Sequence, residues 1–196
     1  MRWGWNKEGT RAKQKGEGYF LQYDDYVYPP ADNPEVAALI QNIEDVFSKT
    51  PMPSEKALIT SQQSDEPAEY ALTFRGLEWH KIHPQLLETC SDALSFFTPQ
   101  ALRYYVPAFL RAHLYGYHDA DPIFCLTYKF YKAEWLESSE SNPAKMEEHQ
   151  RERMSLFTNE ERKVIIAYFR YIVKLDSFNK NAINQALENY WLPSCG

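Results

Sequence analysis

The chain has 196 residues, with 21 Lys and Arg against 27 Asp and Glu, which gives a formal charge of -6. This length predicts one globular domain, because domains commonly hold about 100–200 residues, and it argues against a two-domain enzyme with a separate cofactor module. Hydrophobic residues make up 44% and charged residues 24% of the chain, so global disorder is disfavoured, and no apolar run approaches the ~20 residues that a membrane span requires.

Residues 1–30 are predicted to form a basic and aromatic N-terminal arm. The first 18 residues hold four of the seven glycines and five Lys or Arg against two Glu, which leaves an acidic body behind them. Such a body repels phosphate, so a nucleic-acid partner is disfavoured. Residues 19–30 read YFLQYDDYVYPP, whose high β-propensity but imperfect alternation predicts an extended segment or one edge strand.

The first predicted helix follows the arm. It begins at Pro34, with Asn33 or Asp32 as the N-cap, and its apolar stripe continues to Phe47. The next stretch, residues 54–75, is weakly patterned. It predicts either a loose β-hairpin or a loop that carries one short helix.

Two helices are predicted in the middle of the chain. Residues 84–96 place apolar side chains at three- and four-residue spacings, and Thr98 followed by proline starts the next helix. Pro107 interrupts that second helix because it cannot donate a hydrogen bond to the carbonyl of Arg103. We therefore expect a kink or a break near Tyr104.

The C-terminal third predicts three more helices. Asn142 followed by Pro143 starts a mostly charged helix over residues 144–154, which is predicted to be solvated. Thr158 with Glu161 forms a capping box that opens an apolar helix. A final helix is predicted over residues 178–190. Residues 31–196 are therefore expected to form a mainly α, single compact domain of about six helices, with one short strand pair left open.

A metal site is the first candidate for chemistry. His80 and His83 lie three residues apart, a spacing at which two imidazoles on one helix can share a divalent ion. Pro84 disfavours helical backbone at His83, so the pair is expected to straddle a helix boundary. Asp119 and Asp121 complete such a site only if the fold brings them close. We expect no metal or other cofactor, and keep a small metal-assisted hydrolase using these four residues as the alternative function.

An interaction patch is the second candidate. Arg103, Tyr104 and Tyr105 lie just before Pro107, and Arg and Tyr are enriched among the residues that anchor interfaces. The same residues also fit a buried corner, in which Tyr hydroxyls satisfy the carbonyls that Pro107 leaves free. Both interpretations stay open. The candidate patch comprises Arg103, Tyr104, Tyr105, Trp79, Tyr23 and Tyr26.

Three short stretches carry a resemblance to a known family. Phe74-Arg75-Gly76 with a following Trp79, the run LSFFTPQALRYYVPAFL at residues 94–110, and Phe157-Thr158 before an apolar helix resemble a small bacterial family of unknown function. The similarity covers roughly residues 35–173, and leaves out the arm and the tail beyond residue 174. The resemblance implies no established activity, cofactor or catalytic residue.

The sequence favours a non-catalytic protein-interaction domain, such as an assembly factor, an inhibitor or an immunity-type partner. Aromatic residues make up 15% of the chain, and it contains no Gly-rich phosphate loop, nucleophile elbow or paired Cys-x-x-Cys motif. We expect the partner to be another protein and leave a homo-oligomer open. The charged N-terminus lacks the apolar segment of a signal peptide, and three cysteines cannot all pair within the chain, so we expect a cytoplasmic protein.

Overall fold

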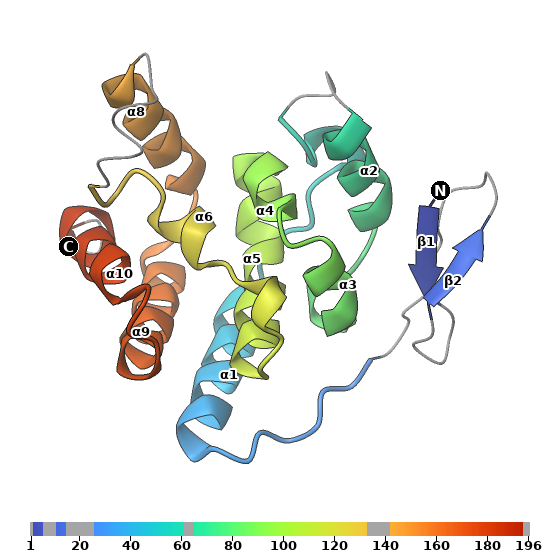
Figure 1. Cartoon of the computed structure of the whole chain (residues 1–196), viewed down its shortest axis with the longest axis horizontal. Helices are drawn as coiled ribbons and strands as arrows, with labels where there is room; N and C mark the ends of the chain where they lie inside the picture. Colours follow the sequence, from blue (N-terminus) through green and yellow to red (C-terminus); the bar gives the residue numbers. More distant parts are fainter. Residues whose placement is uncertain (1, 6–10, 15–25, 61–64, 133–141, 194–196) are drawn as a thin grey trace.

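Helices make up most of this protein (Figure 1). Its structure is a computed structural model that describes residues 2–5, 11–14, 26–60, 65–132 and 142–193. In the first two of these ranges it describes the backbone alone. In chain order the elements are β1 (Arg2–Trp5), β2 (Arg11–Gln14), α1 (Pro34–Phe47), the 3₁₀ turn η1 (Glu55–Ala57), α2 (Asp65–Phe74), the 3₁₀ turn η2 (Trp79–Lys81), α3 (Pro84–Thr89), α4 (Ala93–Phe96), α5 (Pro99–Leu114), the 3₁₀ turn η3 (His118–Ala120), α6 (Ile123–Thr127), α8 (Pro143–Met154), α9 (Asn159–Leu175), α10 (Lys180–Ala186) and the π-helical turn η4 (Leu187–Trp191). The described helices outnumber the expected six. One reason is that residues 84–96 form two short helices rather than one.

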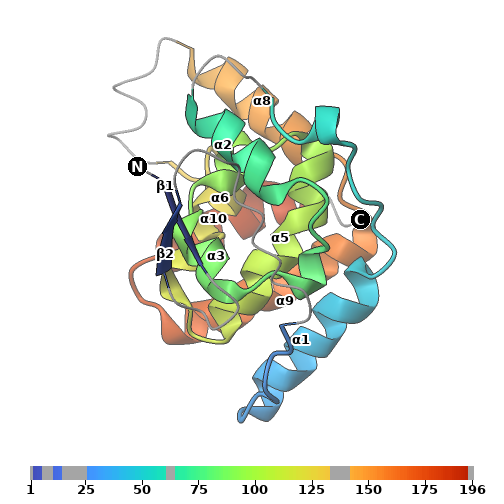
Figure 2. The ribbon, with the colours of Figure 1, turned by 90° about the vertical axis from the view of Figure 1, so that its right-hand side faces the viewer.

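Helix α5 is the centre of the domain. It contacts α1, α3, α4, α8, η2 and η3, and in both views it lies between the other helices (Figure 1 and Figure 2). From Ala101 to Ala112 every residue except Arg103 is buried, as expected of a helix that is packed on all sides. Of the two alternatives expected near Tyr104, a kink or a break, the break is wrong: α5 continues through Pro107 as one helix and is packed against neighbours along its length.

The predicted helix starts at Asn33, Thr98 and Asn142 are confirmed. In each, the side-chain oxygen accepts a backbone N–H of the first turn, and proline occupies the first helical position. The capping box at the start of α9 is also present: Thr158 accepts the N–H of Glu161, and Glu161 accepts that of Thr158.

Paired strands occur in the arm rather than in residues 54–75. β1 and β2 are antiparallel, with Arg2 opposite Gln14. In residues 54–75, the described part forms η1 and α2, which agrees with the helix alternative, and Ile59 makes one isolated bridge to Phe97. Residues 26–30 are extended without being part of a described strand.

The core is rich in aromatic rings. Phe74 packs edge-on against Phe97 and Tyr105, each at 5.1 Å between ring centroids, and Trp191 donates its indole N–H to the carbonyl of Leu126 at 3.0 Å. Many of the aromatic residues therefore serve the interior of one compact domain. Among the described helices, none combines the length and the apolar character needed to cross a membrane.

Helix α8 is less solvated than its charge pattern predicts. Gln150, Arg153 and Met154 are buried. Gln150 donates its amide to the carbonyl of Cys125 at 2.7 Å, and Arg153 donates to the carbonyl of Leu94 at 2.6 Å. These two polar side chains attach α8 to α6 and α4. Helices this short leave most of their backbone carbonyls without a donor from within the helix, and the two side chains supply donors to one carbonyl of each.

Candidate functional site

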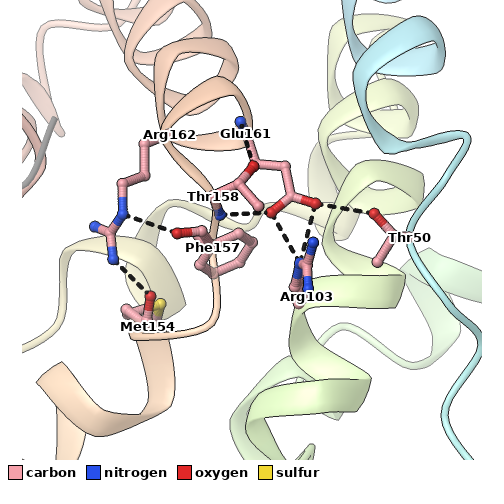
Figure 3. A network of polar contacts seen from close by, with 7 residues as sticks. All are labelled: Thr50, Arg103, Met154, Phe157, Thr158, Glu161 and Arg162. Atoms are coloured by element: carbon pink, nitrogen blue, oxygen red, sulfur yellow. Dashed lines mark hydrogen bonds and ion pairs between the residues drawn. The ribbon is translucent and has the colours of Figure 1, made fainter.

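Arg103 lies inside a polar network that joins three parts of the fold (Figure 3). Its Nε lies 3.0 and 2.8 Å from the two carboxylate oxygens of Glu161, whose side chain is 3% exposed. The same carboxylate accepts the Thr158 N–H at 2.8 Å and the Thr50 hydroxyl at 2.9 Å. The carboxylate thus ties α5 and the segment after α1 to the start of α9.

Tyr104, Tyr105 and Trp79 are buried. The Tyr105 hydroxyl donates to the carbonyl of Phe74 at 2.6 Å and lies 3.2 Å from that of Leu77. Tyr105 therefore satisfies carbonyls at the end of α2, and not the Arg103 carbonyl that Pro107 leaves free. In this conformation these three side chains face the interior, so they offer little surface to a partner.

The four residues of the metal alternative point to separate partners. His80 is exposed and lies 3.3 Å from Glu78, while His83 accepts the N–H of Gln85 as the N-cap of α3. Asp119 is exposed on η3, and Asp121 accepts the N–H that opens α6. Within the described ranges, no three His, Cys, Asp or Glu side chains are grouped so that they could hold a metal ion.

A partly buried polar cluster lies at the C-terminal end of α5. His113 Nδ1 and the Tyr168 hydroxyl are 2.6 Å apart. Burial lowers the pKa of His113, and the carboxylate of Asp121 opposes that shift. Burial also raises the pKa of Asp121, although its bond from the Ile123 N–H opposes the rise. The cluster favours uncharged groups in the folded protein.

The remaining predicted residues lie on the arm. Tyr23 is outside the described residues, whereas Tyr26 belongs to an extended segment, residues 26–30, which we call the strap. Val27 is 82% exposed, while Tyr26 and Tyr28 on either side of it are partly buried. This alternation turns the two tyrosine rings towards the helical body and Val27 away from it.

Tyr28 is held between Arg111 of α5 and Tyr115, the C-cap residue of that helix. The Arg111 guanidinium lies 4.2 Å from the centroid of the Tyr28 ring, and the Tyr115 ring lies 4.6 Å away on a tilted plane. The Tyr115 hydroxyl donates to the carbonyl of Pro29 at 2.7 Å. Tyr28 and Pro29 are thus held by a cation–π contact, a ring contact and a hydrogen bond.

Tyr26 forms the second anchor of the strap. Its ring packs against that of His83 at 4.3 Å and edge-on against Tyr28 at 4.9 Å. Its hydroxyl lies near that of Tyr117, and this contact helps to raise the pKa of Tyr117 to about 12, after burial as the larger cause. His83, considered above as a metal ligand, therefore supports the strap.

Arg111 is the central charged group of this region. The residue is 4% exposed; it donates to Glu44 at 3.0 Å and to the carbonyl of His80 at 2.6 Å. The Trp79 ring lies 5.4 Å from its guanidinium carbon, and Tyr28 covers it at 4.2 Å. A buried arginine with a carboxylate, a carbonyl and two rings is a rigid platform for an aromatic ligand.

The strap borders a cleft of about 690 Å³. The other walls are α1, η2 and the end of α5, with Ile40, Glu44, Arg111 and Tyr115 among the lining residues. The size of this cleft lies in the range of ligand-binding clefts, and its walls, of which the strap is one, are mostly apolar or aromatic. We call the surface of α1, η2 and α5 against which the strap lies, together with the cleft beside it, the strap groove.

Sequence reasoning missed Tyr28, Arg111 and Tyr115, which make the principal contacts of the strap groove. Tyr28 could have been predicted, because it follows Tyr26 by two residues and an extended chain places both side chains on the same face. Arg111 also stood out in principle, as a charge on an otherwise apolar helix. Their meeting depends on the path of the strap, which joins residues 86 positions apart.

Comparisons with known proteins complete the description of the site. Neither the comparison with curated proteins nor that with solved structures finds a match. A family model matches residues 35–195, which include the groove residues of α1, η2 and α5 but leave out the strap. The match begins where the sequence resemblance begins, but it also includes most of the tail that the resemblance left out. The chain therefore belongs to a family of unknown function, DUF6714.

Proposed function

We propose that this protein is a non-catalytic protein-interaction domain whose strap groove binds an extended aromatic segment followed by proline. The supporting observation is the strap itself. It places Tyr28 between Arg111 and Tyr115 while Tyr115 binds the carbonyl of Pro29. Extended segments with alternate anchors, and proline-rich segments on aromatic surfaces, are two common modes of peptide recognition.

The strap is a replaceable occupant. It lies outside the family match, whereas the groove residues of the body lie inside it. Residues 31–33 connect it directly to α1, so it occupies the groove as a tethered ligand. A short tether gives an effective concentration on the order of millimolar, and an outside segment of the same chemistry must overcome this advantage.

The alternative, a metal-assisted hydrolase, gains no support from the described residues. His83 caps α3 and packs against Tyr26, and Asp121 accepts the N–H of Ile123. We therefore propose the interaction function alone.

Three finer expectations accompany this proposal. We expect the protein to act in the cytoplasm, where buried, unpaired Cys90 and Cys125 stay reduced. We expect the family to be bacterial and residues 94–110 to be its most characteristic stretch, because they include the central part of α5, which is buried on all sides. We also expect the occupant in the cell to be another protein, with a second copy of this chain left open.

The test uses the full chain with its strap disabled. A labelled peptide of residues 26–32, YVYPPAD, is titrated into the wild type and into a Tyr26→Ala/Tyr28→Ala variant, and binding is followed by fluorescence anisotropy. We expect binding at least about tenfold tighter to the variant, because the wild-type groove is already occupied. Adding Tyr115→Phe keeps the ring but removes the donor to the Pro29 carbonyl, and is expected to weaken binding. A folded double variant that shows no saturable binding would refute the proposal.

A further inference from the structure

Two buried polar atoms lie on adjoining side chains of the strap groove. Among the described residues, neither the Tyr28 hydroxyl nor Nε of Arg111 has a hydrogen-bond partner of ordinary geometry. The two side chains are in direct contact, since the Arg111 guanidinium lies over the Tyr28 ring at 4.2 Å from its centroid. Nε only donates, and a phenol hydroxyl also accepts. Each atom can therefore compensate for the hydration that the other loses on burial.

The other two nitrogens of Arg111 are already engaged. Nη1 donates to Glu44 at 3.0 Å and Nη2 donates to the carbonyl of His80 at 2.6 Å. These two hydrogen bonds, with the Trp79 ring beside the guanidinium, fix its position. Nε is thus the nitrogen left for an occupant of the groove, and donating through it leaves the two existing bonds intact.

The electrostatics of Tyr28 support the same pairing. Burial raises the pKa of Tyr28, and the charge of Arg111, together with a hydrogen bond from its side chain, opposes this rise. Such an effect favours negative charge on the phenol oxygen, so Arg111 acts on the hydroxyl as well as on the ring. A phenylalanine at this position would keep the cation–π contact, but would leave the buried Nε without an acceptor.

Tyr26 depends less on its hydroxyl. That hydroxyl lies near the hydroxyl of Tyr117, which is a neutral and only partly buried partner. The guanidinium of Arg111 is charged and more deeply buried, and hydrogen bonds from charged donors are the stronger ones. Loss of the hydroxyl should therefore cost more binding at Tyr28 than at Tyr26.

We infer that Arg111 is the specificity-determining residue of the strap groove, and that through Nε it selects an extended segment of a partner protein in which tyrosine, rather than phenylalanine, precedes the proline. This inference rests on the proposed function and specifies its ligand. The ring of that tyrosine stacks on the guanidinium, its hydroxyl accepts from Nε, and the proline carbonyl is bound by Tyr115. The strap carries the same pattern at residues 26–29, so a partner displaces it by concentration or by further contacts, and not by a better ring.

The test is a double-mutant cycle on the full-length Tyr26→Ala/Tyr28→Ala variant, with and without Arg111→Lys. Its ligands are the labelled peptide of residues 26–32 and the Tyr28→Phe and Tyr26→Phe forms of that peptide. With Arg111 in place, we expect the Tyr28→Phe peptide to bind about fivefold more weakly than the unchanged one, and the Tyr26→Phe peptide to lose less than about twofold. With Arg111→Lys, the unchanged and Tyr28→Phe peptides should bind within about twofold of each other, because Nε is gone. Arg103→Lys is the matched control and should leave the preference for tyrosine unchanged.

A second measurement keeps both the strap and Arg111 in place. In the otherwise unchanged chain, Tyr28→Phe is expected to speed chymotrypsin cleavage of the bond between Tyr26 and Val27 several-fold, as followed by mass spectrometry, because a more weakly held strap opens more often. If the unchanged peptide binds, and Tyr28→Phe neither weakens binding nor speeds cleavage, the inference is overturned and the proposed function stands. A preference for tyrosine that persists undiminished with Arg111→Lys also overturns the inference. If no peptide binds any folded variant, both are overturned.

Discussion

Arg103 and Arg111 lie about two turns apart on α5, and each meets a carboxylate from another helix. Arg103 meets Glu161 through Nε, inside a network whose other donors are Thr50 and the backbone of Thr158. Arg111 meets Glu44 and a backbone carbonyl, but part of its covering comes from Tyr28 of the strap.

The two arginines differ in which part of the chain completes their contacts. Every contact described for Arg103 lies within the part of the chain that the family model matches, so its network belongs to the family's common body. The Arg111 surface is completed by a segment outside that match. Under the proposed function, the arginine that is covered by the strap marks the binding site, whereas the arginine whose contacts lie within the body is expected to stabilise the fold.

The largest expected effect is at the carboxylate that holds Arg103. Glu161→Ala leaves Arg103 without its buried partner and removes one half of the capping box of α9, the acceptor of the Thr158 N–H, so we expect the free energy of unfolding to fall by about 3–5 kcal/mol. Urea denaturation measures this change. Glu160→Ala, which removes an exposed pair with Lys163, is the matched control and should cost less than about 0.5 kcal/mol. Equal losses for the two variants would contradict the structural role of Glu161.

The same substitution at both arginines sharpens the comparison. Arg103→Lys should lower the free energy of unfolding by about 1–2 kcal/mol, because lysine cannot reproduce the paired contacts with Glu161, and should leave the strap closed. Arg111→Lys should instead speed chymotrypsin cleavage after Tyr26 by about fivefold, because an ammonium group stacks less well on the ring. If Arg103→Lys opens the strap as much as Arg111→Lys, the division between the two sites is wrong.

The smallest expected effect concerns pH and the cluster beyond Arg111. Burial lowers the pKa of His113 below its usual value of 6.5, so its contribution to stability is complete above pH 6.5 and declines as the pH falls below it. His113→Asn keeps an acceptor for Tyr168 without this titration. Between pH 7.5 and 5.5, we expect the free energy of unfolding to fall more in the wild type than in the variant.

Asp121 affects this measurement in the opposite direction. Its raised pKa stabilises the fold at low pH, and this contribution is lost as the pH rises through the folded-state value. His113 is one of the groups that lower the pKa of Asp121, so His113→Asn also changes this contribution, and the comparison is made in an Asp121→Asn background as well. Urea titrations at the two pH values are the measurement, and parallel losses in the wild type and the variant would count against a neutral, buried His113.

Helix starts were predictable because their signals are local. Asn33, Thr98 and Asn142 each satisfy a backbone N–H two or three residues away, so the relevant chemistry lies within one turn of sequence. The break expected at Pro107 was not predictable in the same way. Whether a proline breaks a helix depends on the packing around it, and packing is a property of the whole domain.

The candidate site was predictable only in part. Tyr26 was identified from its aromatic segment, but Tyr105 and Trp79 proved to be interior because α5 is central, which its sequence pattern did not establish. Arg111 was missed because its meaning depends on a strap that is distant in sequence. Spacing along the chain predicts faces of single helices, whereas contacts between distant segments require the fold.

The attachment of α8 has a consequence for redesign and for the tolerated variation of this helix. Gln150 donates to the carbonyl of Cys125 in α6 and Arg153 to that of Leu94 in α4, so α8 holds both short helices through two neighbouring polar side chains. Replacing either side chain with leucine would raise the apolar content of the interior and still weaken the protein, because a buried carbonyl would lose its donor. A hydrophobicity scale alone would favour apolar residues at positions 150 and 153 of α8. Only side chains that can donate a hydrogen bond to the carbonyls of α6 and α4 are expected to be tolerated at these two positions.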